Sequence, residues 1–183
     1  MKNYGYPNIS MTVYCALFTA LIIVGGYINI PIPIGPVPIV IADFFVMLAG
    51  LFLGFKYAFI SVSLYLALGL IGLPVFAGGT SGLAVIFGPT GGFIIGYVLM
   101  VACIGFITTK IKVTIVSLVI ALALGNILLY LVGVPWLKFI MKLSWPVAVT
   151  IGFMPFTVGI VIKIAAAVAL GYTFIPHFKQ KMA

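Results

Sequence analysis

The stretch GFMPFTVGIVIKIAAAVALGY, residues 152–172, carries one lysine, Lys163, in an apolar run long enough to be part of a membrane helix. A cation costs about 2.5–3.5 kcal/mol at the centre of an inserted helix. An anionic partner can offset this cost, and the chain has one acidic residue, Asp43, for that role. An anionic ligand is the other candidate. We therefore predict that Lys163 serves a binding site for a small organic acid.

The composition around this stretch is that of an integral membrane protein. The chain has 183 residues, of which 65% are hydrophobic and 5% are charged, whereas about a quarter of the residues in a soluble domain are charged. Nine lysines face one aspartate, and the lysines separate hydrophobic runs. This charge excess indicates membrane topology rather than nucleic-acid binding. We predict one integral membrane domain over residues 1–183, with no cofactor and no metal site.

The hydrophobic runs predict an all-α protein with six transmembrane helices, because each can cross much of a hydrocarbon core about 30 Å thick. We place these helices at residues 9–28, 41–55, 57–71, 93–109, 113–132 and from Pro155 to the HFKQK segment near the end. Proline is favourable at a first helical position. Residues 133–149 hold both tryptophans and two lysines, a combination typical of a segment at the membrane interface.

Two apolar segments cannot form ordinary helices. Residues 28–39 contain four prolines and one glycine, and residues 72–92 contain seven glycines and two prolines. Irregular backbone at membrane depth is tolerated only where protein or a cavity shields it. We predict that both segments cover the mouth of the bundle. GPTGG at 88–92 lacks the Lys-Ser/Thr of a phosphate loop, which argues against nucleotide binding.

The lysines also predict orientation, because cytoplasmic loops of membrane proteins are enriched in Lys and Arg. With six helices, one side holds Lys138 and Lys142, and the other holds Lys2, Lys56, Lys110, Lys112, Lys179 and Lys181. We therefore expect both termini in the cytoplasm of a bacterium whose plasma membrane the chain crosses. Both irregular loops, Asp43 and the start of the last helix then face an extracytoplasmic pocket.

Further polar and aromatic residues are candidates for this pocket. Asn126 and Tyr130 are spaced i,i+4 and share one helix face; Asn126 could instead make an interhelical hydrogen bond. Phe76 could stack on a bicyclic ligand or pack within its loop, and Thr80 and Ser81 could offer hydroxyl groups.

The first helix carries Ala16 and Ala20, a pair of small residues that lets another helix approach closely. The pair could pack inside the bundle or dock a partner membrane protein.

Seven blocks of sequence stand in an order that is typical of one family. They are ALFTA (16–20), IPIPIGPVPI (30–39), LAGLFLG (48–54), GLIGLPVFAGG (69–79), GPTGG (88–92), LYLVGVPWL (129–137) and the set Pro155, Phe156, Gly159 and Lys163. In this order they resemble the BioY family, the biotin-specific substrate-binding (S) components of energy-coupling-factor (ECF) transporters. The blocks span most of the chain, and the GLPVFAG and GPTGG blocks are specific.

The resemblance implies a six-helix S-component bundle that captures biotin on the outside. It implies partners, namely a coupling transmembrane subunit and two ATP-binding subunits, and it assigns Ala16 and Ala20 to docking on the coupling subunit. It also implies that Lys163 matches the family lysine that meets the vitamin carboxylate.

Two positions depart from the family pattern. The last helix commonly reads Gly-Asp-x-x-Lys, with the Asp receiving ureido N–H groups, and here Ile160 stands in place of that Asp. The second helix usually has Gln-Thr, and here it has Ala42-Asp43. We hypothesise that Asp43 replaces the missing acid from across the pocket. The alternative is that Asp43 only caps its helix.

Other functions remain as rivals to biotin capture. The missing Asp favours a related carboxylated ligand, such as lipoate or a biotin precursor. An intramembrane enzyme would need a nucleophile with a base, and the chain has no Glu and one His, His177, near its end. We therefore predict a non-enzyme. A purely structural subunit is the remaining alternative.

Overall fold

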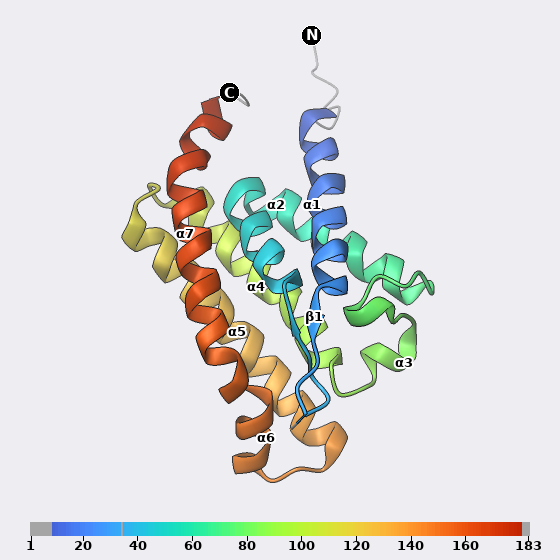
Figure 1. Cartoon of the computed structure of the whole chain (residues 1–183). Coiled ribbons are helices and arrows are strands. Elements are labelled where there is room, and N and C mark those ends of the chain that lie inside the picture. Colours follow the sequence, from blue (N-terminus) through green and yellow to red (C-terminus); the bar gives the residue numbers. More distant parts are fainter. Residues whose placement is uncertain (1–8, 34, 181–183) are drawn as a thin grey trace.

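The computed structural model describes residues 9–33 and 35–180, and these residues are almost entirely helical. Two short strands form a small hairpin before the second helix (Figure 1). The elements in chain order are α1 (Ile9–Tyr27), β1 (Asn29–Ile30), β2 (Ile39–Val40), α2 (Ala42–Leu70), η1 (Ala77–Gly79), α3 (Leu83–Ile86), α4 (Gly91–Lys110), α5 (Ile115–Met141), α6 (Trp145–Gly152), η2 (Met154–Phe156) and α7 (Thr157–Gln180).

Helix α2 contains the second and third predicted helices, joined by a sharp kink at Gly54. This glycine has φ 69° and ψ −176°, a backbone conformation that residues with a side chain rarely adopt. In Figure 1 the two arms of α2 run in clearly different directions from this point. Within the described residues, five helical segments are long and apolar enough to cross a membrane, and the kink in α2 accounts for the sixth predicted helix. The predicted turn at Lys56 lies two residues from the observed one.

The predicted end of the fifth helix was wrong. Helix α5 does not end at Val132 but continues through Pro135 to Met141, and the short α6 follows. A proline removes only one helical hydrogen bond, and neighbouring helices in a membrane bundle can support the helix around it. Here Gly133 allows the Phe93 ring to approach so closely that an added Cβ would lie 2.4 Å from it.

The last helix also begins later than predicted. Pro155 lies in the 3₁₀ turn η2, and α7 starts at Thr157. Lys163 is therefore six residues into α7, roughly 9 Å along its axis at 1.5 Å per residue.

The core centres on α4, which packs between α2 and α5. Glycines make this close packing possible, because a Cβ added at Gly50 or Gly125 would lie within 2.8 Å of Ile104 side-chain atoms. Thr108 on α4 donates a hydrogen bond to the Gly50 carbonyl at 3.2 Å. Glycine contacts and buried hydroxyl groups thus hold α2, α4 and α5 as one unit.

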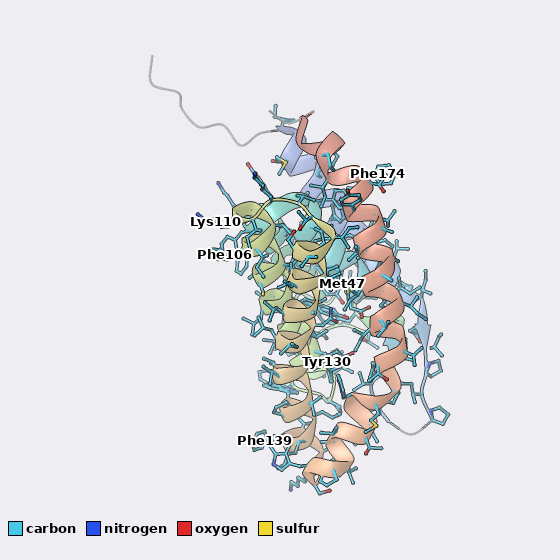
Figure 2. All side chains as sticks on the ribbon, turned by 90° about the vertical axis from the view of Figure 1, so that its left-hand side faces the viewer. Met47, Phe106, Lys110, Tyr130, Phe139 and Phe174 are labelled. Atoms are coloured by element: carbon cyan, nitrogen blue, oxygen red, sulfur yellow. The ribbon has the colours of Figure 1, made fainter. Side chains whose placement is uncertain are left out.

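The two ends of the bundle are formed by different elements. The start of α1 and the end of α7 lie at one end, whereas α6 and the tip of the β-hairpin lie at the other (Figure 1). Lys110 lies near the end that holds Phe174, and Phe139 lies towards the opposite end (Figure 2). Lys2 and Lys181, which the orientation prediction also used, are outside the described residues.

Candidate functional site

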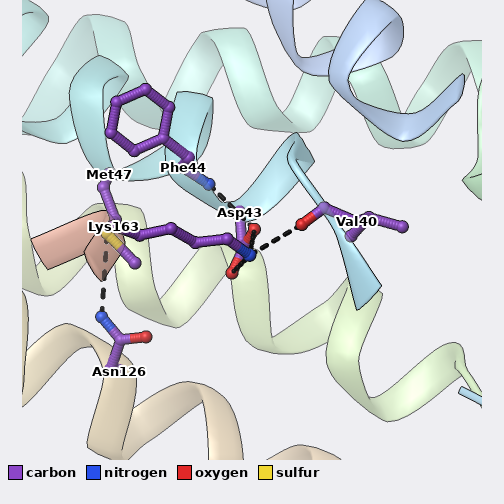
Figure 3. Close-up of polar contacts among 6 residues, drawn as sticks. All are labelled: Val40, Asp43, Phe44, Met47, Asn126 and Lys163. Carbon is purple, nitrogen blue, oxygen red and sulfur yellow. Dashed lines mark hydrogen bonds and ion pairs between the residues drawn. The ribbon is translucent and has the colours of Figure 1, made fainter. Parts of the chain in front are cut away.

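The predicted pair of charged residues, Asp43 and Lys163, forms a direct ion pair. Lys163 Nζ donates to Asp43 Oδ1 at 2.7 Å and Oδ2 at 2.9 Å, and to the Val40 carbonyl at 2.7 Å (Figure 3). The Asp43 side chain is 9% exposed and the Lys163 side chain is 16% exposed. An ammonium group has three N–H donors, so these acceptors use its full capacity. The pair joins α2, α7 and the β-hairpin.

Local backbone structure brings the three partners together. Strands β1 and β2 pair antiparallel, with Asn29 opposite Val40, so the chain returns to the end of α1 before α2 begins. Asp43 then lies in the first turn of α2, where its Oδ1 also accepts from the Phe44 N–H at 3.0 Å. The side chain therefore contacts its own first turn and a residue 120 positions away.

Aromatic side chains enclose the ion pair in a small pocket of about 40 Å³. Its aromatic walls are Phe93, Tyr97, Tyr130 and Phe156. Tyr130 packs edge-to-face on Phe93, with ring centroids 5.9 Å apart. An aromatic enclosure lowers the local polarity, which strengthens the electrostatic interactions of the pair with any polar group that enters.

A larger cavity of about 370 Å³ adjoins this pocket. The two share wall residues, namely Val37, Pro38, Val40, Phe93 and Tyr97. The volume is within the range of small-molecule sites. Both predicted irregular segments line the cavity. The first contributes Pro36, Val37 and Pro38, and the second contributes Ala77, Thr80, Ala84, Gly88 and Thr90 among others. The expected cavity beside the lysine is thus present, between the two loops and the bundle.

Phe93 and Tyr97 are among the lining residues that the sequence analysis missed. They are spaced i,i+4 at the start of α4, and this spacing could have identified them as one helix face. It also missed the contact that fixes the second loop, in which Trp136 Nε1 on α5 donates to the Gly88 carbonyl at 3.0 Å.

The three candidates from the second loop occupy different places. Thr80 lines the cavity, and its hydroxyl group donates to the Ala77 carbonyl at 3.0 Å. Ser81 is not among the lining residues in the described part of the chain. Phe76 is fully buried with its ring 5.4 Å from that of Tyr65. Their contacts with a ligand stay predictions.

Asn126 lines neither the cavity nor the ion-pair pocket in the described part of the chain. Its side-chain amide donates to the Leu122 carbonyl at 2.9 Å and approaches the Met47 sulfur at 3.9 Å (Figure 3). Its Oδ1 is buried and has no hydrogen-bond partner among the described residues. Asn126 also lines a groove between α5 and α7. A ligand contact by Asn126 stays a prediction.

Ala16 and Ala20 lie on the exposed face of α1. The opposite face packs on α2, where Thr19 donates to the Ser61 carbonyl at 3.0 Å. The alanine pair is therefore available to a partner, and its docking role stays a prediction. Across the described ranges, no group of three His, Cys, Asp or Glu side chains gathers to hold a metal ion.

Sequence comparison finds relatives over most of the chain. The BioY family model matches residues 1–180. A probable biotin transporter BioY from Pyrococcus horikoshii is 41% identical over 156 residues, which cover 85% of this chain and 90% of the relative. The biotin transporter BioY of Thermotoga maritima is 40% identical over 156 residues, with 84% and 90% covered.

Structural comparison agrees. A crystal structure of the S-component for biotin from an ECF-type ABC transporter superposes with a TM-score of 0.84 at 35% identity, covering 94% of this chain and 93% of that one. The crystal structure of FolT bound with folic acid gives a TM-score of 0.62 at 17% identity, with 91% of both chains covered. At this identity the second match shows a shared fold only.

Proposed function

The chain belongs to the BioY family, and we propose that it captures biotin on the extracytoplasmic side as the S component of an ECF-type importer. The observation that carries this proposal is the enclosed Asp43–Lys163 ion pair beside a cavity of ligand size. The relatives in this family are named as transporters, which supports the prediction that the chain is not an enzyme.

The chemistry of the ion pair supports an arrangement that differs from our expectation for Lys163. Asp43 already neutralises this lysine. A ligand carboxylate at the same point would place two negative charges around one positive charge in a poorly hydrated pocket, which is unfavourable. A cyclic urea adds no charge. Its carbonyl oxygen can replace one of the acceptors that now use the three N–H donors of Lys163. Its N–H groups can then donate to Asp43, and both contacts are charge-assisted hydrogen bonds.

We therefore propose that the ureido ring of biotin binds at the ion pair and that its carboxylate points towards the two loops. This arrangement gives Asp43 the role that an aspartate at position 160 has in the family pattern. Here position 160 is an isoleucine that lines the groove between α5 and α7.

The partners and orientation follow from the same proposal. The chain contains no phosphate loop, so partner subunits must hydrolyse ATP: a coupling transmembrane subunit and two ATP-binding subunits. The exposed alanines of α1 offer the docking face, because small residues permit close helix contacts. Both termini lie in the cytoplasm, and the two loops face outside.

The test is equilibrium binding of radiolabelled biotin to the purified chain, with competition by three compounds. Biotinol lacks the carboxylate, lipoate lacks the ureido ring, and unlabelled biotin is the reference. We expect biotinol to compete within about tenfold of biotin and lipoate to compete poorly. Lys163→Ala should weaken biotin binding by about ten- to a hundredfold, the value of a hydrogen bond to a charged group.

The matched control is Lys56→Ala, an exposed lysine close to the kink in α2, which should leave binding unchanged. If biotinol failed to compete, we would conclude that the carboxylate of biotin, and not its ureido ring, binds at Lys163. Strong binding of lipoate without binding of biotin would replace biotin by a related carboxylated ligand as the substrate.

A further inference from the structure

A second recess, separate from the cavity, lies between α5 and the α6–α7 segment. Its volume is about 580 Å³. It opens on the outer surface of the bundle, since Leu131 on one rim is 63% exposed and Val161 on the other is 68% exposed. The remaining walls come from Ala123, Asn126, Ile127, Tyr130, Val134, Pro135, Trp145, Val149, Phe153, Thr157, Ile160 and Ile164. We call it the α5–α7 groove.

The surface of the α5–α7 groove is almost pure hydrocarbon. Two of its polar side chains donate to carbonyl groups of their own segments. Asn126 donates to the Leu122 carbonyl at 2.9 Å, and Thr157 donates to the Met154 carbonyl at 2.8 Å. Such a surface offers little to a water-soluble ligand. It suits a hydrocarbon chain, which needs no hydrogen bonds.

The length of the groove matches one leaflet of a bilayer. Its α5 wall runs from Ala123 to Pro135, twelve residues apart, or roughly 18 Å along the helix. Each leaflet supplies about half of a 30 Å hydrocarbon core. A neighbouring recess shares Val161 and Ile164 with the groove and extends the seam to Val119. One lipid tail can therefore lie along the seam for most of its length.

Basic residues mark one end of the groove. Lys138 Nζ lies 5.0 Å from the centre of the ring of Trp145, a groove residue. Lys142, three residues before Trp145, is exposed at the end of α5. Tryptophan and lysine together typically lie at the level of lipid headgroups. We propose that the α5–α7 groove binds an acyl chain of an anionic phospholipid, whose phosphate contacts Lys138 and Lys142.

The α5–α7 groove is distinct from the exposed alanine pair of α1 and from the ligand cavity. Helix α1, which carries the exposed alanine pair, and the α5–α7 side lie on different sides of the bundle (Figure 1). A partner docked on α1 leaves the groove open. Tyr130 lies between α5 and α7 (Figure 2) and lines both the groove and the ion-pair pocket, so a bound lipid tail would pack behind the wall of that pocket.

The proposal is tested by native mass spectrometry of the full chain released from nanodiscs of equal parts phosphatidylglycerol and phosphatidylcholine. We expect one retained phosphatidylglycerol. Lys138→Gln and Lys142→Gln should each lower its retention about fivefold, and the double variant about thirtyfold, the effect expected for one basic residue at a membrane surface. Lys112→Gln, an exposed lysine outside the groove walls, is the control and should change nothing.

The acyl part of the site is tested by filling it. Ala123→Phe places a ring in the groove and should remove the retained lipid, whereas Ala166→Phe, the same change at an exposed α7 position outside the groove walls, should not. Equal retention of both lipids, or equal loss in the two phenylalanine variants, would overturn the proposal. So would a second copy of this chain bound to wild type and lost in Ala123→Phe. Lys142→Gln changes an exposed residue, so it decides the question even if Ala123→Phe fails to fold.

Discussion

Helices α4 and α7 are held in the bundle by different forces. In the most apolar 18 residues of α4, 61% of the residues are buried in the bundle. In the most apolar 18 residues of the segment that contains α6 and α7, 17% are buried. A Cβ added at Gly105 on α4 would lie 2.7 Å from the backbone of Phe55. At Gly159 on α7, no described atom lies within 4 Å of such a Cβ. Close packing fixes α4, whereas α7 has one strong polar connection, from Lys163 to Asp43 and Val40.

This difference indicates how a ligand could act on the protein. Packing is insensitive to a small polar molecule, but an ion pair can exchange partners with one. A ligand that inserts between Asp43 and Lys163 would act on the contact that holds α7 against α2 and the β-hairpin. The densely packed helices then form a frame, and α7 forms a wall whose position depends on the site.

The largest effect should come from breaking the ion pair on one side. Lys163→Met leaves Asp43 buried and unpaired, which should destabilise the chain by about 3–5 kcal/mol. Adding Asp43→Asn removes that isolated charge and should restore most of the loss. Thermal unfolding in detergent, combined with biotin binding, checks both. The double variant should be stable and unable to bind; equal instability of the single and double variants would mean that charge does not hold α7.

A smaller effect should come from packing, and it should differ between the two helices. Gly105→Ala forces the backbones of α4 and α2 apart, and we expect a loss of about 2–3 kcal/mol. Gly159→Ala meets open space and gains helix propensity, so its stability should stay equal or rise by up to about 1 kcal/mol. The two unfolding curves are the measurement. A similar loss at both positions would show that α7 is packed as tightly as α4.

The sequence could predict features that involve rare residue types, because such residues have few possible partners. We expected Lys163 to meet an anionic ligand, and a salt bridge with Asp43, the single acidic residue, was the alternative. Lys163 Nζ lies 2.7 Å from Asp43 Oδ1, so the alternative is present. The proline-rich segment also excludes helix through simple backbone chemistry. The glycine-rich segment was predicted to be irregular, but it contains the 3₁₀ turn η1 and the short helix α3. Both segments line the cavity. These predictions depend on local rules that tertiary structure rarely overrides.

Other features depend on packing that a single sequence does not encode visibly. A proline usually interrupts a helix. Helix α5 continues through Pro135 because Gly133 and Leu137 pack tightly on neighbouring elements. An aromatic residue such as Phe76 suits a ligand wall and a core equally well, and it lies in the core. The α5–α7 groove arises from a gap between two helices, which no motif predicts.

The smallest effect should come from Thr80, on the loop over the cavity. Thr80 lines the cavity with its hydroxyl donor committed to Ala77, so the oxygen can still accept a hydrogen bond from the ligand. Thr80→Val removes that acceptor and should weaken biotin binding by about two- to tenfold, the value of one neutral hydrogen bond.

Ser81→Ala is the matched variant, because Ser81 is the next residue and is outside the described cavity wall. Radiolabelled biotin binding should be unchanged in it. If Ser81→Ala weakened binding as much as Thr80→Val did, the loop would have to rearrange around the ligand. The loop would then resemble α7, as a part that the ligand positions, and would no longer belong to the fixed frame around α4.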